Sequence, residues 1–283
     1  MKLYIVSGVS GSGKSTALHV FEDLDYYCID NLPVVLLPAF AEKCTSSSFP
    51  QKAAIGIDAR NVLEDIQHFP QSLEKLKKSG ISCELLFFTA DDNILIKRFS
   101  ETRRKHPLTQ DDVPLADAIK NERKLLDPIA DCADLLVDTS HYNIYQLRDL
   151  VKSRVTDKPP NTLSILFQSF GFKHGVPTDA DFVFDSRCLP NPYWETNLRK
   201  QTGLDKDVAE FLEKEPLVNK LIDDIKGLLD FWIPRYEADN RSYITIAIGC
   251  TGGQHRSVYI VEQLSKYFNK ENKNIITRHR ELL

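Results

Sequence analysis

Short apolar runs alternate with amphipathic segments along the first 155 residues of the chain. Almost continuous apolar runs are typical of strands that are buried on both faces of a parallel sheet. Such runs lie at 3–6, 26–29, 52–58, 81–90 and 133–140. Apolar residues recur at helical spacing in 61–78, 115–131 and 143–154. Strands that alternate with helices in this way predict a parallel, doubly wound α/β sheet.

The same alternation resumes in the second half of the chain. Strands are predicted within 162–175, 181–194 and 243–250, and residues 205–233 have helical spacing, with Trp232 expected in the core. Pro159-Pro160 lies among polar residues in 156–162, a composition typical of a linker. We therefore expect two α/β domains, 1–155 and 161–283.

Composition narrows the class of protein without identifying it. With 42% hydrophobic and 27% charged residues, the 283-residue chain is typical of a soluble globular protein. A net charge of −4 argues against a protein that coats nucleic acid uniformly, but it leaves room for a local basic patch. The six cysteines form no C-x-x-C pair and no zinc spacing. Because no apolar run approaches 18 residues and no signal peptide is evident, we expect a cytoplasmic protein with reduced thiols and no membrane span.

The strongest motif follows the first apolar run. Gly8-x-x-x-x-Gly13-Lys14-Ser15 is the P-loop pattern, and it has the preceding strand and following helix that the motif requires. Its glycines let backbone N–H groups wrap a phosphate at the N-terminus of that helix. Lys14 is predicted to reach the β- and γ-phosphates, and Ser15 to bind Mg²⁺. The first domain is therefore predicted to have a kinase-like P-loop fold, with ATP or GTP bound by Gly8, Val9, Ser10, Gly11, Ser12, Gly13, Lys14 and Ser15.

Acidic residues follow the next two predicted strands. Asp30 either holds Mg²⁺ through water or caps the next helix. The strand at 52–58 runs into Asp58, Ala59, Arg60 and Asn61, where an acid beside an arginine suits nucleotide recognition. In P-loop enzymes the strand equivalent to 81–90 usually ends in an acid that supports Mg²⁺, but Thr89 stands there. Asp58 is therefore the predicted carboxylate for Mg²⁺, with Asp30 as the alternative.

A basic segment after the strand at 81–90 is predicted to act on the nucleotide. Arg98, Arg103 and Arg104 precede His106-Pro107 at a helix end, where small-molecule kinases carry lid arginines. Such arginines clamp the transferred phosphate and stabilise charge in the transition state. Arg103 or Arg104 is therefore predicted to be catalytic together with Lys14 and Ser15. The alternative is a basic, solvated helix face.

A second glycine loop follows the strand at 243–250. The spacing Cys250-x₅-Arg256-Ser257 builds a phosphate cradle from backbone amides, closed by a guanidinium. The same spacing occurs in cysteine phosphatases, but Gly249 stands where these enzymes usually carry His, and no general-acid loop is evident. A plain glycine turn is the remaining alternative. The predicted phosphate-ligand residues are Cys250, Thr251, Gly252, Gly253, His255 and Arg256.

Basic and aromatic residues mix near residues 266–280. Such a segment suits an RNA backbone with stacked bases, although a solvated helix end would have a similar composition. Basic residues elsewhere in the second domain extend the candidate patch. The predicted RNA contacts are Lys173, His174, Arg256, Lys270, Lys273, Arg278 and Arg280.

Together these stretches resemble the RapZ/YvcJ family of bacterial nucleotide-binding proteins. The resemblance covers nearly the whole chain, and the C-terminal glycine-loop string is highly specific. The matching strings are GVSGSGKS, CIDNLP, DARN, RFSETRRKHPL, ADLLVDTS, FQSFGFKHG, DADFVFD, LPNPYW, TGLD, RSYITIAIGCTGGQHRSVYIVEQL and TRHR. This chain departs from the family at 87–90, where it reads FFTA instead of the usual FLDA or FLEA.

The resemblance implies a weak ATPase and GTPase, with GTP assigned to Asp58–Asn61. It implies a C-terminal domain that binds small regulatory RNA and senses an amino-sugar phosphate, glucosamine 6-phosphate. By this likeness the loop Cys250–Arg256 is the sugar-phosphate site, and Asp185 is a candidate partner for the amine. An endoribonuclease partner and a homo-oligomer, a tetramer in the family, are also implied.

The most specific hypothesis is a regulatory adaptor that hydrolyses ATP or GTP slowly. Two other hypotheses use the same residues. A small-metabolite kinase would account for the P-loop, Asp30 and the lid arginines, and a nucleotide-binding adaptor without hydrolysis would account for Thr89. The first requires a small acceptor molecule, and the second predicts affinity for nucleotide without turnover.

Overall fold

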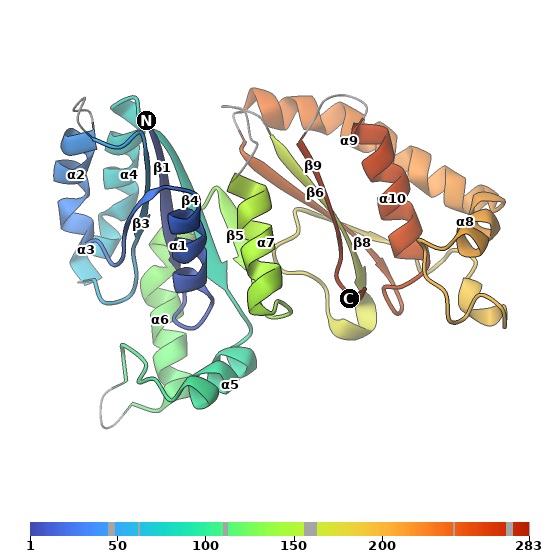
Figure 1. The fold of residues 1–283 in the computed structure, drawn as a ribbon, viewed down its shortest axis with the longest axis horizontal. Coiled ribbons are helices and arrows are strands. Elements are labelled where there is room, and N and C mark those ends of the chain that lie inside the picture. The colour runs from blue at the N-terminus through green and yellow to red at the C-terminus, as the bar shows by residue number, and fades with distance from the viewer. Residues whose placement is uncertain are drawn as a thin grey trace. The chain divides into compact units, whose positions relative to one another are not determined.

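A computed structural model describes residues 1–44, 49–61, 63–109, 113–155, 163–239, 241–269 and 274–282. The chain divides into two compact units, Met1–Thr156 and Asp157–Leu283, and each is built on a sheet of its own (Figure 1). Every strand pairing recorded in the two sheets is parallel. The predicted α/β class with parallel sheets is confirmed. The predicted linker, 156–162, lies outside the described residues.

The first sheet places the P-loop strand at its centre. Its described strands are β1 (Lys2–Gly8), β2 (Tyr27–Ile29), β3 (Lys52–Gly56), β4 (Ser82–Thr89) and β5 (Leu135–Asp138), in the order β2-β3-β1-β4-β5. β1 pairs with β3 on one side and with β4 on the other. In open α/β sheets, ligands bind at the carboxyl ends of strands where the strand order reverses. The end of β1 is such a point.

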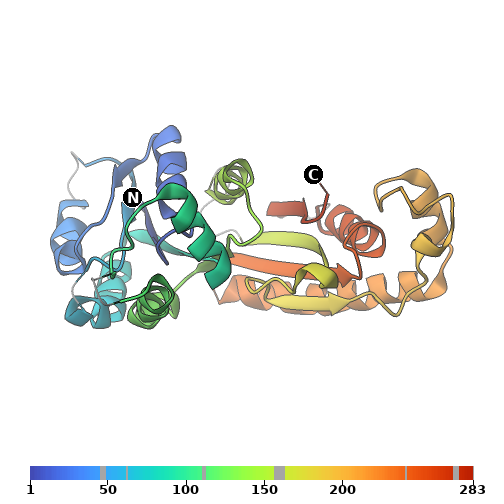
Figure 2. The same cartoon turned by 90° about the horizontal axis from the view of Figure 1, so that it is seen from below.

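Helices cover both faces of this sheet. α1 (Lys14–Asp23) and α7 (Ile144–Val155) lie on one face, and α4 (Phe69–Lys78) and α6 (Leu115–Ala130) lie on the other (Figure 2). The smaller elements are η1 (Val34–Leu36), α2 (Leu37–Cys44), α3 (Leu63–Gln67) and α5 (Asp92–Thr102). Residues 61–78, predicted as one helical segment, form two helices, because Pro70 opens the first turn of α4.

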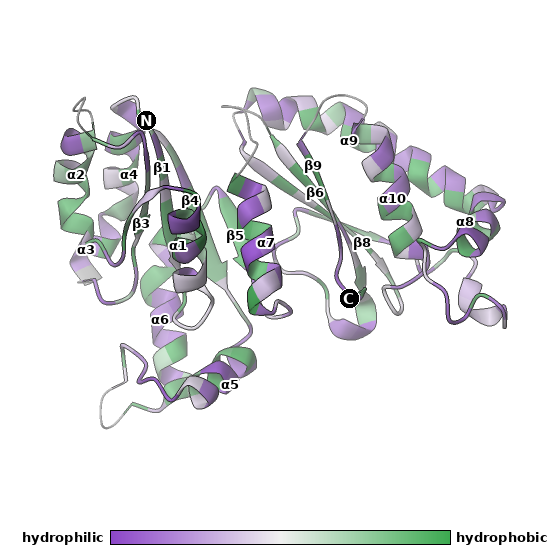
Figure 3. Cartoon of the chain, viewed as in Figure 1, coloured by the Kyte–Doolittle hydropathy of each residue, from purple (hydrophilic) through white to green (hydrophobic). Residues whose placement is uncertain are grey.

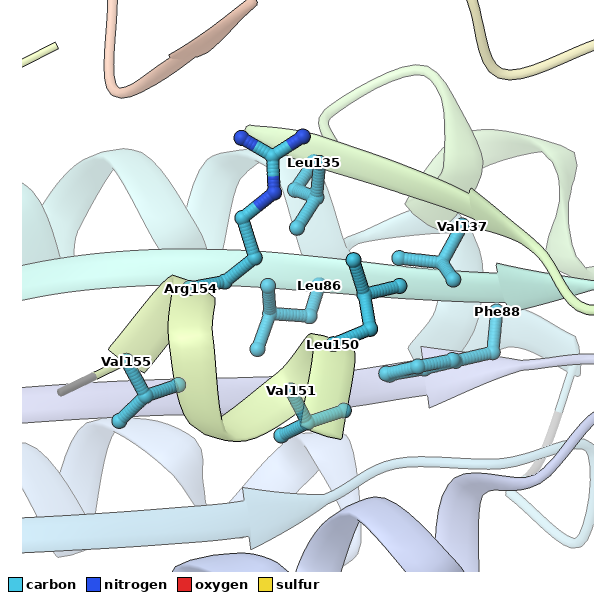
Figure 4. Close-up of a pocket in the computed structure, with 8 residues that line it drawn as sticks. All are labelled: Leu86, Phe88, Leu135, Val137, Leu150, Val151, Arg154 and Val155. Atoms are coloured by element: carbon cyan, nitrogen blue, oxygen red, sulfur yellow. The ribbon is translucent and has the colours of Figure 1, made fainter. Parts of the chain in front are cut away.

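Apolar side chains hold α7 against strands β4 and β5. A small crevice remains between the three elements (Figure 4). It is lined by Leu86, Phe88, Leu135, Val137, Leu150, Val151, Arg154 and Val155. Arg154 spans this contact with its aliphatic stem and is only 2% exposed, so α7 packs as an apolar face that carries one buried charge.

The second unit has a four-stranded sheet and a different strand order. Its strands are β6 (Ser164–Gly171), β7 (Phe182–Asp185), β8 (Tyr243–Cys250) and β9 (Asn274–His279), ordered β7-β8-β6-β9. In Figure 2, α9 (Pro216–Ala238) and α10 (Arg256–Asn269) cover opposite faces. The short elements are η2 (Phe172–His174), η3 (Pro192–Trp194) and α8 (Lys206–Glu213).

The second unit has one strand that the sequence analysis did not predict, and one of its predictions is wrong. Residues 274–279, within the basic segment, are a strand paired with β6. Trp232 is 42% exposed, so the prediction that it lies in the core is wrong. The buried stripe of α9 is formed by Val218, Ile222, Ile225, Leu229 and Ile233, and Trp232 lies beside this stripe.

Hydrophobic residues concentrate on the strands and recur along the helices (Figure 3). Each unit accordingly has a large buried core cluster of its own. None of the described helices combines the length and the apolar character needed to cross a bilayer.

Candidate functional site

The P-loop follows β1 directly and ends at the first residue of α1. Gly8 and Gly13 adopt φ values of 140° and 106°, which side-chain-bearing residues rarely adopt. A β-carbon at Gly8 would also overlap the backbone of Phe88 in β4. The loop therefore depends on glycine both for its backbone conformation and for its close approach to the neighbouring strand.

The loop presents unused hydrogen-bond donors. The N–H groups of Gly11 and Gly13 donate to no other backbone group in the described loop. The Ser12 hydroxyl is buried and has no partner among the described residues. The first N–H groups of α1 also lack intrahelical acceptors. This set of donors fits a bound phosphate group.

Lys14 is folded back onto the loop. Its Nζ donates to the carbonyl oxygen of Gly8 at 2.6 Å. Burial lowers the pKa of Lys14, while the negative charges of Glu122 and Asp58 oppose that shift. A bound phosphate would favour the ammonium form in the same way.

Asp58 and Arg60 form a closed ion pair beside the P-loop. The Arg60 backbone and guanidinium donate to the Asp58 carboxylate at 2.6 to 3.1 Å. Burial raises the pKa of Asp58, but the Arg60 hydrogen bonds and the charge of Lys14 outweigh it and lower that pKa. Asn61 is used within the protein, because its side chain accepts from the Val34 N–H and donates to the Asp58 carbonyl. Ala59 is buried, and Asp30 lies 4.0 Å from Arg60.

The end of β4, where an acid is usual, carries an arginine contact. The guanidinium of Arg123 donates to the Thr89 hydroxyl at 2.7 Å, to the Ala90 carbonyl, and to Asp92. Among the described residues, no group of three or more His, Cys, Asp or Glu side chains is arranged to hold a metal ion. Mg²⁺ in such enzymes is held mostly by phosphates and water, with one or two protein groups. Exposed Ser15 in the first turn of α1 and Asp58 beside Lys14 fit that limited role.

The arginine that contacts the P-loop is Arg98. Its guanidinium donates to the Gly11 carbonyl at 3.1 Å and to Thr139 at 2.7 and 2.9 Å. Arg103 and Arg104, which the sequence favours, are exposed, and neither forms a hydrogen bond or ion pair with the described residues. They follow α5 directly, and Arg103 has a left-handed backbone conformation, with φ at 51°.

Two residues that the sequence analysis did not assign to the site, Glu122 and His106, meet at the P-loop. Glu122 in α6 accepts from the backbone N–H and the hydroxyl of Ser10, at 2.8 and 2.7 Å. The same carboxylate lies 2.9 Å from Nε2 of His106. Ser10 and Glu122 are 112 residues apart, so no local pattern could reveal this contact.

The second glycine loop closes around the Cys250 thiol. Sγ of Cys250 accepts from the Gly253 N–H at 3.2 Å and lies 3.2 Å from the Ser257 hydroxyl. Burial raises the pKa of Cys250, but the bonds from Ser257 and Gly253 and the charge of Arg256 outweigh it and lower that pKa. The thiol is only 2% exposed.

Arg256 links the loop to the chain that follows β7. Its guanidinium donates to the carbonyls of Arg187 and Leu189 at 3.0 and 2.9 Å, and to the Thr251 hydroxyl at 3.3 Å. Nε of Arg256 and Nε2 of buried His255 have no partner among the described residues. The guanidinium therefore fixes the loop, and Nε is its unused donor.

The remaining predicted contacts are spread around this loop. The Asp185 carboxylate is bonded to Arg187 at 2.7 to 3.0 Å. Lys173 donates its backbone N–H to the Thr251 carbonyl. Arg278 donates to Gln168, and Lys270 and Lys273 lie outside the described residues.

The C-terminal segment contains the predicted contact Arg280 and also Glu281, which the sequence analysis did not identify. Arg280, only 4% exposed at its side chain, donates to the carbonyls of His174 and Gly175 and to Glu281. A β-carbon at Gly253 would overlap the Glu281 carboxylate, so this acid lies directly against the glycine loop. Its Oε2 atom is buried without a partner in the described structure.

Comparisons with known proteins identify the family of both halves of the chain. Residues 1–158 match the RapZ-like N-terminal domain, and residues 163–283 match the RapZ C-terminal domain. The chain belongs to the RapZ family. The predicted resemblance is thereby confirmed.

RapZ-family relatives match over the whole chain. A nucleotide-binding protein of Marinobacter nauticus is 53% identical over 285 residues, covering 100% of this chain and 97% of the relative. One of Nitrosococcus oceani is 54% identical over 282 residues, covering 100% of both.

Among solved structures, a sugar kinase from Janibacter is 15% identical with a TM-score of 0.38, covering 54% of this chain and 93% of the kinase. A shikimate kinase from Bacteroides thetaiotaomicron is 14% identical with a TM-score of 0.35, covering 53% and 94%.

Proposed function

We propose that the first unit binds ATP or GTP with Mg²⁺ and hydrolyses the nucleotide slowly. The observation that carries this proposal is the P-loop at the carboxyl end of central strand β1, with Lys14 beside a set of unused N–H donors. The name of the relatives, nucleotide-binding protein, supports the same reading.

Each residue has a distinct role in this proposal. Lys14 neutralises charge on the β- and γ-phosphates, and Ser15 holds Mg²⁺ with Asp58 nearby. Arg103 or Arg104 stabilises the transition state, and Asp58 to Asn61 contribute to nucleotide recognition. Phosphoryl transfer needs mainly positioning and electrostatic stabilisation, so no covalent intermediate on the protein is required.

Replacing Lys14 tests this proposal. We expect Lys14→Ala to reduce ATP and GTP hydrolysis to background, because the β/γ charge loses its neutralising ammonium. Initial rates of phosphate release measure the effect. Lys78→Ala, at an exposed lysine of α4, is the matched control and should leave the rates unchanged. Equal rates in the wild type and Lys14→Ala would contradict the assignment.

Two alternatives give different outcomes in the same assay. A small-metabolite kinase would release ADP only when an acceptor is present. Hydrolysis rates that stay the same when each of a panel of metabolites is added would therefore exclude it. A nucleotide-binding adaptor without hydrolysis would bind ATP and show no Lys14-dependent turnover. Thr89, which is bonded to Arg123 where an acid is usual, favours this second alternative.

We further propose that the second unit serves a regulatory adaptor. Its loop Cys250–Arg256 binds an amino-sugar phosphate, with the phosphate on loop amides and Asp185 near the amine. Its basic residues bind small regulatory RNA, which is presented to an endoribonuclease by a cytoplasmic homo-oligomer. The support is the family membership together with a glycine loop that Arg256 fixes to the chain after β7.

RNA binding can be tested in the cells that produce the protein. Ultraviolet crosslinking followed by sequencing should enrich a few small RNAs over background. Lys173→Glu should reduce this enrichment at least tenfold, because it reverses a charge beside the loop. Lys206→Glu, at an exposed lysine of α8, is the control. Absence of enrichment would contradict the proposed adaptor role but would not affect the proposed phosphate site.

A further inference from the structure

Glu122 is an acid in an unusual place. It is fully buried, and it lies against the P-loop, where a nucleotide would bring several negative charges. Buried carboxylates are costly unless they are paired and hydrogen-bonded. This carboxylate accepts three hydrogen bonds from two partners, which are Ser10 and His106.

The Glu122 side chain is held as a carboxylate anion. Burial raises the pKa of Glu122, but the hydrogen bonds from His106 and Ser10 and the charge of Lys14 outweigh it and lower that pKa. The negative charge is therefore present while the P-loop is ready for a nucleotide. A charge that repels phosphates does not serve tight nucleotide binding, so the carboxylate needs another role.

His106 is oriented by its surroundings. Nδ1 of the imidazole accepts the backbone N–H of Leu108 at 3.1 Å, so Nε2 carries the proton and donates to Glu122. The ring is 3% exposed and packs on Phe99, with 5.1 Å between ring centroids. The Thr109 hydroxyl donates to the His106 carbonyl at 2.5 Å. The segment that follows α5 is thus anchored at His106.

The predicted catalytic arginines belong to the same segment. Arg104 precedes His106 by two residues, so their Cα atoms lie within about 7 Å of each other. Arg103 and Arg104 are exposed and form no bond with the described residues, so their side chains are able to turn toward a phosphate. The anchor at His106 fixes the end of that segment that follows the two arginines.

We propose that Glu122 is a positioning residue for nucleotide hydrolysis, which fixes the P-loop at Ser10 and the arginine segment at His106 in one arrangement. The inference rests on the hydrolysis proposed for the first unit. Because phosphoryl transfer depends on positioning, loosening this link slows the chemical step. Nucleotide affinity is not weakened, because the link contributes a repulsive charge to the ground state.

The test separates turnover from binding. Glu122→Gln keeps the shape and removes the charge, and we expect kcat to fall at least tenfold while the Kd of a fluorescent ATP analogue stays within threefold or tightens. His106→Ala should lower kcat to a similar extent, and His106→Gln, which retains a donor near the Nε2 position, should recover part of it. Glu84→Gln, at a largely buried acid in β4, should leave kcat and KM within twofold.

A double variant tests whether the two residues act as one unit. Glu122→Gln with His106→Ala should lose no more than twofold beyond Glu122→Gln alone. Losses that multiply, or a Glu122→Gln kcat within twofold of the wild type, would overturn the proposal. Thermal unfolding checks each variant, and if Glu122→Gln does not fold, Ser10→Ala and His106→Ala carry the same comparison. A wild type without Lys14-dependent turnover would refute the hydrolysis itself, and the positioning role with it.

Discussion

At the scale of single residues, the same ion pair occurs once in each unit. Asp58 comes just after β3, and Asp185 is the last residue of β7. In both pairs, Asp58 with Arg60 and Asp185 with Arg187, the backbone N–H and the guanidinium of the arginine donate to the carboxylate two residues earlier. The two pairs differ in burial, because the Asp58 side chain is 10% exposed whereas the Asp185 side chain is 45% exposed. The sequence identified both acids, but it could not rank their electrostatic contributions.

The buried pair predicts a pH-dependent contribution to stability. The folded-state pKa of Asp58 is lowered, so its contribution is present above the unfolded value and is lost as the pH falls through the folded value. We expect Asp58→Asn to cost about 1 kcal/mol of unfolding free energy at pH 7, since Arg60 is half exposed and screened. Relative to the wild type, the cost should be smaller at pH 2, which lies below the unfolded pKa of about 4. Denaturant unfolding at both pH values measures it.

Asp185→Asn is the matched comparison and should cost less at pH 7, because water screens the exposed pair. A loss from Asp58→Asn that is equal at pH 7 and at pH 2 would show that packing, and not ionisation, is the source.

At the scale of elements, the close approach of β8 to β6 explains Gly249. The two strands pair with Gly249 opposite Phe170, and a β-carbon there would overlap the rings of Phe170 and Phe172. The histidine that cysteine phosphatases usually carry at this position therefore has no room. Strand packing at Gly249 therefore constrains the start of the loop that follows β8, independently of any ligand.

This packing predicts opposite effects for two glycines of the same unit. Gly249→Ala should destabilise the unit by about 1–3 kcal/mol, the usual cost of overpacking. Gly227→Ala in α9 should stabilise it by about 0.5–1 kcal/mol, because nothing lies near its added methyl group and alanine favours the helix. Denaturant unfolding followed by Trp fluorescence compares them, and an unchanged or higher midpoint for Gly249→Ala would contradict the overlap.

At the scale of the whole molecule, local patterns predicted the strands and loops but not the contacts between them. Apolar runs located β1, β3, β4 and β8, and glycine spacing located both loops. Strand β9 was missed because polar and basic residues flank its short apolar pair Ile275-Ile276. Glu122 was missed, and Arg98 was named but not preferred over Arg103 and Arg104, because their P-loop partners are 112 and 87 residues away. Whether such distant residues meet depends on the order of the strands in the sheet, and hydrophobic periodicity does not predict that order.

The division into two units predicts that each ligand stabilises one of them. Both tryptophans, Trp194 and Trp232, belong to the second unit, so Trp fluorescence follows the unfolding of that unit, whereas far-UV circular dichroism follows both. A ligand at one hundred times its Kd should add about 2.7 kcal/mol to the stability of the state that binds it. Glucosamine 6-phosphate should therefore raise the unfolding midpoint seen by fluorescence, and Mg²⁺ with ATP should raise only the transition that fluorescence does not follow.

Glucosamine without its phosphate is the control, because it cannot engage the amides of the loop Cys250–Arg256. No shift with glucosamine 6-phosphate would contradict the sugar-phosphate site. A fluorescence midpoint raised by Mg²⁺ and ATP would show that the two units are energetically coupled. Since coupling is reciprocal, glucosamine 6-phosphate would then have to change the affinity for ATP by the same factor, which a nucleotide titration in its presence measures directly.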